Sequence, residues 1–222
     1  MDAFRSRRER MVAEHIEARG IRDERVLDAM RRVPREEFVR PWSRANAYDD
    51  HPLPIDDGQT ISQPYIVALT LEAALLRADD VVLDVGTGSG YAAAVAAELV
   101  GRVVSIERHE GLATAAAAVL KKLGYENVTV VVGDGTLGYP TQAPYDAIVA
   151  AAAGPRIPQP WVEQLTDGGR IVMPVGDMGF GQVLTRATRE PDGSLRMESF
   201  GGVTFVPLIG EHGVREPRQW RL

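Results

Sequence analysis

The sequence predicts an α/β fold built on a doubly wound, mostly parallel sheet. Three observations support this class. Apolar runs of strand length alternate with helical segments between residues 80 and 176, a glycine-rich turn follows the first run, and an acidic residue stands at the end of each of the first three. This alternation is typical of parallel sheets, whose ligands bind outside the carboxyl ends of the strands.

The N-terminal section, residues 1–79, is predicted to be mostly helical. Phe4 to Arg19 has helical spacing, and Asp23 can cap a second helix whose apolar face carries Val26, Leu27, Met30 and Val33. Pro34 ends that helix because proline cannot continue it. Residues 41–63 contain three prolines and a glycine before position 60 and are predicted to form a loop, after which Pro64 to Leu76 returns to helix.

The second section, residues 80–176, carries the alternating pattern. Strands are predicted near 80–85, 102–107, 127–132, 145–151 and 169–175, with helices over 90–99, 110–123 and 159–165. This order of elements gives a Rossmann-like core in which the strand ends form the ligand site.

The third section, residues 177–222, is predicted to add antiparallel strands. These are Gln182–Thr188, Ser194–Glu198 and Gly202–Val206, with a turn at Pro191-Asp192-Gly193. No internal repeat separates the three sections, and we interpret the chain as a single domain.

Composition narrows the classes of function. The chain has 222 residues, 45% hydrophobic and 25% charged, which is ordinary for a globular protein. It has no cysteine, which excludes disulfides and thiolate chemistry, and its formal net charge of −6 disfavours sequence-independent binding of nucleic acid. Because neither a signal peptide nor an apolar run of membrane-spanning length is evident, we expect a cytoplasmic protein without a membrane partner. We also expect a monomer.

The glycine-rich turn is the most informative segment. It reads Asp84-x-Gly86-x-Gly88-x-Gly90, directly after an apolar strand and before an alanine-rich helix. A dinucleotide site instead reads G-x-G-x-x-G and binds a pyrophosphate at the helix start. Here an acid at the strand tip would repel phosphate and attract a cation. S-adenosylmethionine carries an amine and a sulfonium and no phosphate, so the turn favours that cofactor over NAD.

Two further acids support this interpretation. Glu107 ends the next predicted strand, about 20 residues after the turn, where an acid can accept both ribose hydroxyls. Asp134 follows the third strand and is placed to meet the adenine amino group. Taken singly, each acid is better explained as a solvated loop residue or a helix cap, but three acids at successive strand ends behind one glycine turn are much harder to explain in that way.

A second signal precedes the sheet. The segment from Gly58 to Tyr65 places the hydroxyls of Thr60 and Ser62 on either side of one apolar residue, just before a helix. Pro64 suits the first position of that helix. Spacing alone favours the simpler alternative, in which Ser62 caps the helix.

The chain resembles the protein-L-isoaspartate (D-aspartate) O-methyltransferase family over roughly residues 22–210. The glycine turn is shared by many methyltransferases, whereas the segment Gln59-Thr60-Ile61-Ser62-Gln63-Pro64 is specific. The matching segments keep their order: Arg25–Met30, Val33–Val39, Leu53–Ile55, Gly58–Tyr65, Leu83–Tyr91, Ser105–Arg108, Gly133–Gly135, Tyr145–Ile148, Gly168–Gly176 and Phe205–Leu208.

The resemblance implies a class I methyltransferase fold and an enzyme that uses S-adenosylmethionine. In similar proteins the methyl group goes to the free carboxylate of L-isoaspartyl or D-aspartyl residues in proteins and peptides. The ester then collapses to a succinimide, whose hydrolysis restores some normal aspartate. The serine at the position of Ser62 is taken as the active-site residue in this family.

Site residues follow from the acids, the glycine turn and the resemblance together. We expect Thr60, Ile61 and Ser62 to contact the substrate, and no metal to be needed. The expected cofactor-binding residues are Thr60, Ile61, Ser62, Asp84, Gly86, Thr87, Gly88, Ser89, Gly90, Glu107, Arg108, Gly133, Asp134 and Gly135.

The chemistry needs no general base. A carboxylate with a pKa near 4 is already ionised at neutral pH and is itself the nucleophile. Rate must then come from alignment of the reacting atoms and exclusion of water. The four histidines are scattered along the sequence and are expected to be structural or solvated.

Two features depart from the family pattern. The run after the fourth strand is Ala150-Ala151-Ala152-Ala153, where the family often has a hydroxyl or glycine at Ala151, and the tail from Glu211 to Leu222 matches no family segment. Two other functions stay open: a related O-methyltransferase with one dedicated peptide substrate, and a catalytically silent cofactor-binding module. The retained acids and glycines argue against the silent module.

Overall fold

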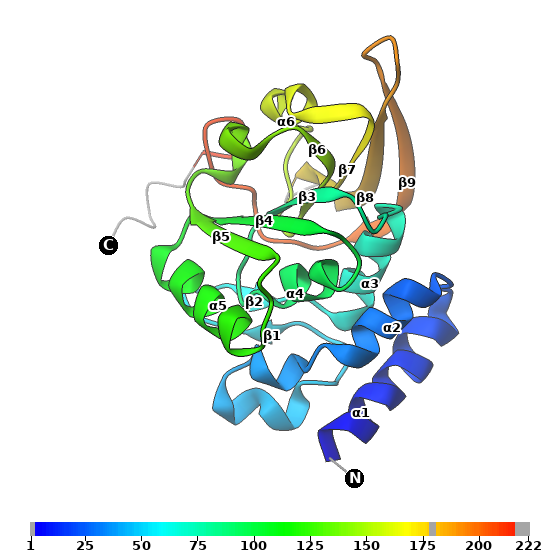
Figure 1. The fold of residues 1–222 in the computed structure, drawn as a ribbon, viewed down its shortest axis with the longest axis vertical. Coiled ribbons are helices and arrows are strands. Elements are labelled where there is room, and N and C mark those ends of the chain that lie inside the picture. Colours follow the sequence, from blue (N-terminus) through cyan, green and yellow to red (C-terminus); the bar gives the residue numbers. More distant parts are fainter. Residues whose placement is uncertain (1–2, 178–180, 216–222) are drawn as a thin grey trace.

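A seven-stranded sheet organises the chain (Figure 1). The structure is a computed structural model, and it describes residues 3–177 and 181–215. The strands follow the order β5-β4-β3-β6-β7-β8-β9 across the sheet. Their bounds are β3 Val81–Val85, β4 Arg102–Glu107, β5 Val128–Val132, β6 Tyr145–Ala150, β7 Leu165–Asp177, β8 Gly181–Arg189 and β9 Leu195–Val203.

The direction of the strands changes the sheet from parallel to antiparallel at one side. Strands β3 to β7 pair in parallel, whereas β8 runs antiparallel to β7 and β9 antiparallel to β8. The chain builds outward from β3 through β4 to β5, then returns to pair β6 on the other side of β3. The junction between β3 and β6 is therefore the topological switch point, where ligands of doubly wound sheets bind.

Helices cover both faces of the sheet. Their bounds are α1 Ala3–Met11, α2 Glu24–Arg32, α3 Pro64–Ala73, α4 Tyr91–Ala97, α5 Glu110–Lys122 and α6 Gln159–Glu163. The first helix continues as a π-helical turn over Val12–Ile16 and a 3₁₀ turn over Glu17–Arg19. Four other 3₁₀ turns span Arg35–Glu37, Pro41–Asn46, Gly135–Leu137 and Pro140–Gln142.

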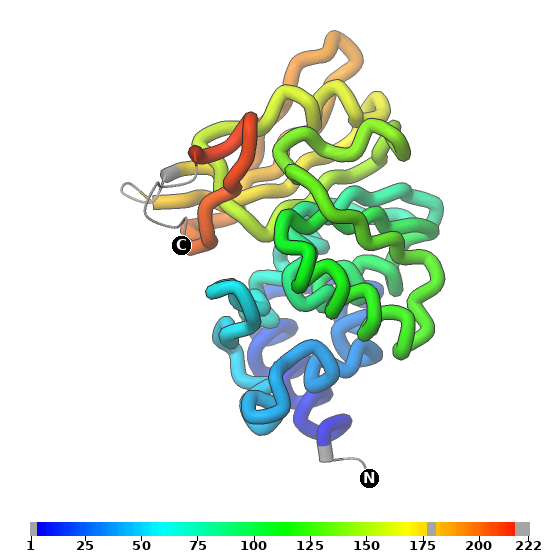
Figure 2. Tube along the Cα trace, turned by 90° about the vertical axis from the view of Figure 1, so that its left-hand side faces the viewer, coloured from blue at the N-terminus to red at the C-terminus, as the bar shows by residue number. Residues whose placement is uncertain are grey.

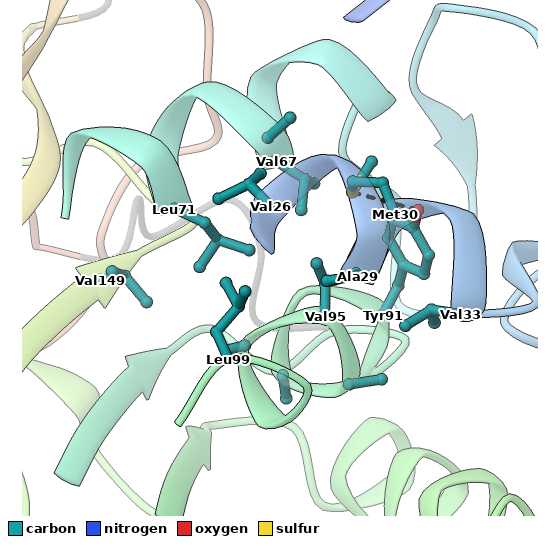
Figure 3. Packing of buried hydrophobic residues seen from close by; sticks show 14 of the residues in the cluster. Val26, Ala29, Met30, Val33, Val67, Leu71, Tyr91, Val95, Leu99 and Val149 are labelled. Carbon is teal, nitrogen blue, oxygen red and sulfur yellow. Dashed lines mark hydrogen bonds between the residues drawn. The ribbon is translucent and has the colours of Figure 1, made fainter. Parts of the chain in front are cut away.

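Two apolar clusters form the core, one on each face of the sheet. The larger cluster joins α2, α3 and α4 to the sheet face that carries Val149 (Figure 3). Val82 of β3 belongs to the same cluster. The smaller cluster packs Trp161 of α6 against the opposite face, which carries Leu83 and Ile148. Because the N-terminal helices share the larger cluster with the sheet, we propose that all three sections belong to one domain.

The predicted order of elements is confirmed from Asp23 to β7. Asp23 caps α2, since its side chain accepts a hydrogen bond from the backbone N–H of Arg25. The helix then ends at Arg32, two residues before Pro34. Most bounds agree within two or three residues; α3 ends at Ala73, three residues earlier than predicted.

Two predictions about local structure were wrong. Residues 41–63, predicted to be loop, contain a 3₁₀ turn and the small antiparallel pair β1 (Leu53–Pro54) and β2 (Thr60–Ile61). The two predicted strands Ser194–Glu198 and Gly202–Val206 form one strand, β9, which ends at Val203. The β8–β9 register shifts between Val183 and Thr185, and pairing continues on both sides of this shift.

Candidate functional site

The glycine turn lies at the carboxyl end of β3, beside the switch point. Gly86, Gly88 and Gly90 have φ values of 92°, 52° and 88°, which side chains with a Cβ rarely adopt. The turn is held on β4, because the backbone N–H groups of Gly86 and Thr87 both donate to the carbonyl of Ile106. The backbone can therefore approach a ligand closely at this point, as the glycine spacing predicts.

A buried chain of hydroxyl groups supports Asp84 beneath the turn. The hydroxyl of Ser105 donates to Oδ2 of Asp84 at 2.6 Å. Thr87 Oγ1 lies 2.6 Å from Ser105 Oγ. Because the single hydroxyl hydrogen of Ser105 is used in the hydrogen bond to Asp84, the hydroxyl of Thr87 must be the donor to Ser105. All three side chains are buried, so this chain fixes the direction in which the carboxylate points.

Asp84 is a buried acid. Within residues 3–177 and 181–215, no lysine or arginine charge acts on its carboxyl group. Burial raises the pKa of Asp84 to about 6, opposed by the hydrogen bond from Ser105 and assisted by the negative charge of Glu107. A bound cation would relieve this desolvated charge. The carboxylate thus suits an ammonium or sulfonium ligand.

Glu107 connects the glycine turn to the next helix. Its Oε2 accepts a hydrogen bond from the backbone N–H of Gly88 at 2.9 Å, and its Oε1 accepts from the N–H of His109 at 3.0 Å. Each carboxylate oxygen keeps one further lone pair, so the group can still accept two hydroxyls from a ribose. Glu107 therefore shapes the turn in addition to the binding role that the sequence predicts.

The carboxylate of Asp134 already accepts three hydrogen bonds from other parts of the chain. Its Oδ1 accepts from both the backbone N–H and the hydroxyl of Thr136, and its Oδ2 accepts from the backbone N–H of Glu211. It caps the 3₁₀ turn over Gly135–Leu137 and fastens the segment that follows β9. One lone pair of Oδ2 remains for a ligand, so the contact with adenine stays a prediction.

A cleft opens beside the glycine turn and brings the two predicted signals together. The empty space within it, open solvent included, is about 340 Å³, and Ser62 of the loop and Asp84 of β3 both line it. The loop between β1 and β2 lies against the turn, where a Cβ on Gly88 would meet Cδ1 of Ile55 at 3.5 Å. The remaining lining comes from α3, α4, β6 with the residue that follows it, and the segment after β9: Ile66, Val67, Thr70, Leu71, Ala92, Val149, Ala150, Ala151 and Phe205.

The N-terminus of α3 is capped by a residue that sequence reasoning missed. The residue at the N-cap position is Gln63, whose side chain makes no capping hydrogen bond. Asp50 takes this role from outside the helix, because its Oδ1 accepts from the backbone N–H of Tyr65 at 3.1 Å and its Oδ2 accepts from Nε2 of Gln63. Ser62 therefore does not cap α3, and it lines the cleft instead.

The expected substrate and cofactor residues occupy different environments. Thr60 is exposed and pairs with Pro54, whereas the side chain of Ile61 is buried in the larger core cluster. Ile61 can therefore offer only its backbone to a ligand. Arg108 is exposed at the end of β4. Gly133 is tied to β4 through the carbonyl of Glu107.

Close packing explains two small residues of the predicted site. A Cβ on Gly135 would lie 2.6 Å from Cγ1 of Val85, so only glycine fits beside the tip of β3. Ala151 donates its backbone N–H to the carbonyl of Val85 and lies 3.6 Å from the position of a Cβ on Gly86. Its methyl group lines the cleft without adding a hydroxyl. Among the described residues, no group of acidic or histidine side chains could hold a metal ion.

Sequence comparisons place the chain beside known methyltransferases. The family model for protein-L-isoaspartate(D-aspartate) O-methyltransferase matches residues 6–213. Protein-L-isoaspartate O-methyltransferase 2 of Pelobacter propionicus is 56% identical over 207 residues, covering 93% of this chain and 92% of that protein. The protein-L-isoaspartate O-methyltransferase of Methanoculleus marisnigri is 53% identical and covers 96% of each chain.

Solved structures agree with the sequence comparisons. A protein-L-isoaspartate O-methyltransferase superposes with a TM-score of 0.83 at 32% identity, covering 93% of this chain and 67% of that one. A Plasmodium falciparum protein described as a beta-aspartate methyltransferase was solved in complex with S-adenosyl-L-homocysteine. It gives a TM-score of 0.78 at 25% identity and covers 91% of this chain and 98% of its own. The class I methyltransferase fold predicted from the sequence is thus confirmed.

Proposed function

Because the chain belongs to the protein-L-isoaspartate(D-aspartate) O-methyltransferase family, we propose that it methylates the free carboxylate of L-isoaspartyl and D-aspartyl residues. S-adenosylmethionine is the cofactor. One observation carries this function within the structure: Ser62, from the family-specific segment, and Asp84, from the cofactor turn, line the same cleft. Substrate and cofactor can therefore meet there.

The residues present fit the cofactor by their charge. Asp84 provides a buried carboxylate that no lysine or arginine of the described chain neutralises, as the methionine amine requires. Glu107 provides two oxygens with spare lone pairs for the ribose hydroxyls. The positive-φ glycines remove side chains from the surface between these two acids. When bound, the cofactor supplies an electrophilic methyl group.

The proposed mechanism depends on alignment. The substrate carboxylate is ionised at neutral pH and attacks without help from a base. Ser62 can donate a hydrogen bond from its hydroxyl to one carboxylate oxygen and leave the other oxygen free to attack. Ile66, Phe205 and Ala151 give the cleft apolar walls that restrict water. With the cofactor held by Asp84 and Glu107, its methyl group would be supplied directly to the free carboxylate oxygen, and no protein group would be covalently changed.

The product explains why such methylation serves repair. A methyl ester carries a better leaving group than a carboxylate, so the following backbone amide nitrogen can attack it and expel methanol. The resulting five-membered succinimide opens by hydrolysis to aspartyl or isoaspartyl linkages. Damaged proteins and peptides are thus the expected partners, since the altered residue is the feature that is recognised.

We further propose the site roles predicted from sequence. The cofactor residues are those of the glycine turn with Asp84, Glu107, Arg108 and the segment from Gly133 to Gly135. Thr60, Ile61 and Ser62 contact both ligands. Support for these roles comes from Ser62 and Asp84, which line the cleft, and from the place of the other cofactor residues at or just after the carboxyl ends of β3, β4 and β5. Ile61 acts through its backbone because its side chain is buried.

The setting of the protein is also part of this proposal. None of the described helices combines the length and apolar character that crossing a membrane requires. We propose a cytoplasmic monomer that does not bind nucleic acid. The formal net charge of −6 supports the last point, because phosphate backbones attract basic surfaces.

One experiment separates this function from its alternatives. Purified protein is given S-adenosylmethionine with a labelled methyl group, an isoaspartyl peptide, and the same peptide with a normal aspartyl linkage. We expect label on the isoaspartyl peptide alone. Equal label on both peptides contradicts the proposed selectivity. Binding of S-adenosylhomocysteine without transfer to either peptide supports a dedicated substrate or a silent module instead.

A further inference from the structure

The end of β9 is built differently from an ordinary strand end. Val203 is the last residue of β9 and pairs with Gln182 of β8. Beyond it the chain leaves the sheet, and Phe205 reaches the cleft (Figure 2 shows this orange-red segment on the same side of the molecule as the cyan β1–β2 pair). The sheet therefore ends where the cleft wall begins.

The side chain of Gln182 replaces the missing strand pairing. Its amide Oε1 accepts a hydrogen bond from the backbone N–H of Phe205 at 2.6 Å, and its Nε2 donates to the carbonyl of Phe205 at 3.1 Å. One amide thus satisfies both backbone groups of a single residue. Gln182 is 6% exposed, so water competes little for these bonds.

The far end of the same segment is bound to the stretch of chain that follows β6. The backbone N–H of Ala153 donates to the carbonyl of Val206 at 2.8 Å, and the N–H of Leu208 donates to the carbonyl of Ala153 at 2.7 Å. Phe205 is consequently held from both sides. Its side chain lines the cleft with Ser62 and Ala151, residues of two other segments.

We propose that Phe205 is a specificity-determining wall for the peptide substrate and that Gln182 is the positioning residue that holds it. This inference rests on the proposed function. An isoaspartyl linkage lengthens the backbone by one methylene and places the carboxylate directly on the α-carbon. A fixed aromatic ring in the same cleft as Ser62 limits the path along which a backbone can enter. The longer linkage fits that path, and the normal aspartyl side chain does not.

The chain offers a matched control. The side-chain amide of Gln164 also makes two hydrogen bonds to the backbone. It accepts from the N–H of Tyr139 and donates to the carbonyl of Leu137, both at 2.8 Å. It is 8% exposed, and neither of its partners lines the cleft. Replacing either glutamine by methionine removes an amide of similar burial, but only Gln182→Met releases Phe205.

The test compares wild type with Gln182→Met, Gln164→Met and Phe205→Ala. Initial rates with isoaspartyl and aspartyl peptides give kcat and KM for each peptide, and calorimetry gives the Kd of S-adenosylhomocysteine. For Gln182→Met we expect the peptide KM to rise about tenfold or more, since small misplacements of binding groups are costly. The Kd of S-adenosylhomocysteine should change less than twofold. Gln164→Met should lose thermal stability with an unchanged peptide KM.

Phe205→Ala keeps the test independent of folding, because this half-buried side chain can be truncated without opening the core. It should raise the isoaspartyl KM and narrow the preference over the aspartyl peptide. An active Phe205→Ala protein with the wild-type KM and the wild-type preference for the isoaspartyl peptide would contradict the proposed role of Phe205 in specificity. Equal KM increases in Gln182→Met and Gln164→Met would overturn the positioning role. A wild-type protein that methylates neither peptide overturns the proposed function, and this role with it.

Discussion

The carboxylate of Asp50 accepts a hydrogen bond from the backbone N–H of Tyr65 at 3.1 Å and so caps α3 from a separate loop. Nη1 of Arg19 lies 2.6 Å from the other Asp50 oxygen, and its guanidinium stacks 3.6 Å over the ring of Tyr65. The helix that follows the family-specific segment is thus anchored by the N-terminal section. Ser62 can serve the cleft without weakening the helix start.

This arrangement predicts opposite effects for two substitutions. Ser62→Ala should reduce turnover by about tenfold or more, because a group that positions the substrate carboxylate is lost. The melting temperature should change little. Asp50→Ala should cost about 0.5–2 kcal/mol of unfolding free energy through loss of the cap. Thermal denaturation and initial rates on both variants check this. A destabilised Ser62→Ala protein with normal turnover would show that Ser62 is structural.

The capping of α3 shows where sequence reasoning had to stop. Asp23 was correctly predicted as a cap because it lies next to the helix it serves. Asp50 lies 15 residues before Tyr65, and nothing in its local sequence marks the contact. Ser62 therefore looked like the nearest available cap. Local signals predicted local partners, and the actual partner was brought in by the tertiary fold.

The same distinction explains the rest of the site. Asp84, Glu107 and Asp134 are predicted to gather because parallel strands end at one edge of a sheet. The structure places Asp84 in β3, Glu107 at the end of the adjacent strand β4, and Asp134 two residues after β5, which is next to β4. The β1–β2 pair has only two residues in each strand, too short for a periodic pattern. Phe205 was visible in sequence only as part of a family segment, since its place in the cleft depends on Gln182.

A second prediction concerns the cost of the buried acid. The folded-state pKa of Asp84 is about 6, whereas an unfolded aspartate titrates near 3.8. The folded protein therefore binds the proton more tightly, and this stabilising contribution is present below pH 4 and lost as pH rises through 6. Above that pH the ionised group destabilises the free protein by up to about 3 kcal/mol.

Asp84→Asn should consequently raise the melting temperature of the free protein at pH 7.5. It should also abolish the further rise that S-adenosylhomocysteine produces in wild type, because the carboxylate that receives the amine is gone. Differential scanning calorimetry with and without ligand measures both effects. At pH 5 the two free proteins should differ less, since Asp84 is then largely protonated. A variant that keeps the ligand-induced rise would contradict the assignment of Asp84.

A third prediction concerns Ser105, which acts on the ligand through Asp84. Its hydroxyl lowers the pKa of Asp84 against the effects of burial and of Glu107. In wild type, affinity for S-adenosylhomocysteine should fall as pH drops through about 6, because protonation removes the charge that the amine needs. Ser105→Ala should move this midpoint to higher pH. Calorimetric Kd values between pH 5 and 8 give the midpoint.

Thr87→Val provides the comparison, since it removes the outer hydroxyl of the chain and leaves the bond from Ser105 to Asp84 in place. Its midpoint should move less than that of Ser105→Ala. Equal affinity losses at every pH, with no movement of the midpoint, would mean that Ser105 contributes only to packing.

The fourth prediction concerns Glu107 and the identity of the cofactor. Wild-type protein should bind S-adenosylmethionine and S-adenosylhomocysteine but not NAD, because Asp84 and Glu107 would face the pyrophosphate with two negative charges. Glu107→Ala should weaken binding of S-adenosylhomocysteine by about 1.5–3 kcal/mol, the range for hydrogen bonds to a charged group. Calorimetry measures the affinity for each ligand.

Glu107→Gln separates the role of Glu107 in holding the turn from its role in binding the ribose. The amide carbonyl of glutamine can still accept one backbone N–H, from Gly88 or from His109, but glutamine lacks the second acceptor oxygen. Its affinity should lie between those of wild type and Glu107→Ala. Tight binding of NAD, or full affinity in Glu107→Ala, would sink the assignment of the ribose contact to this residue.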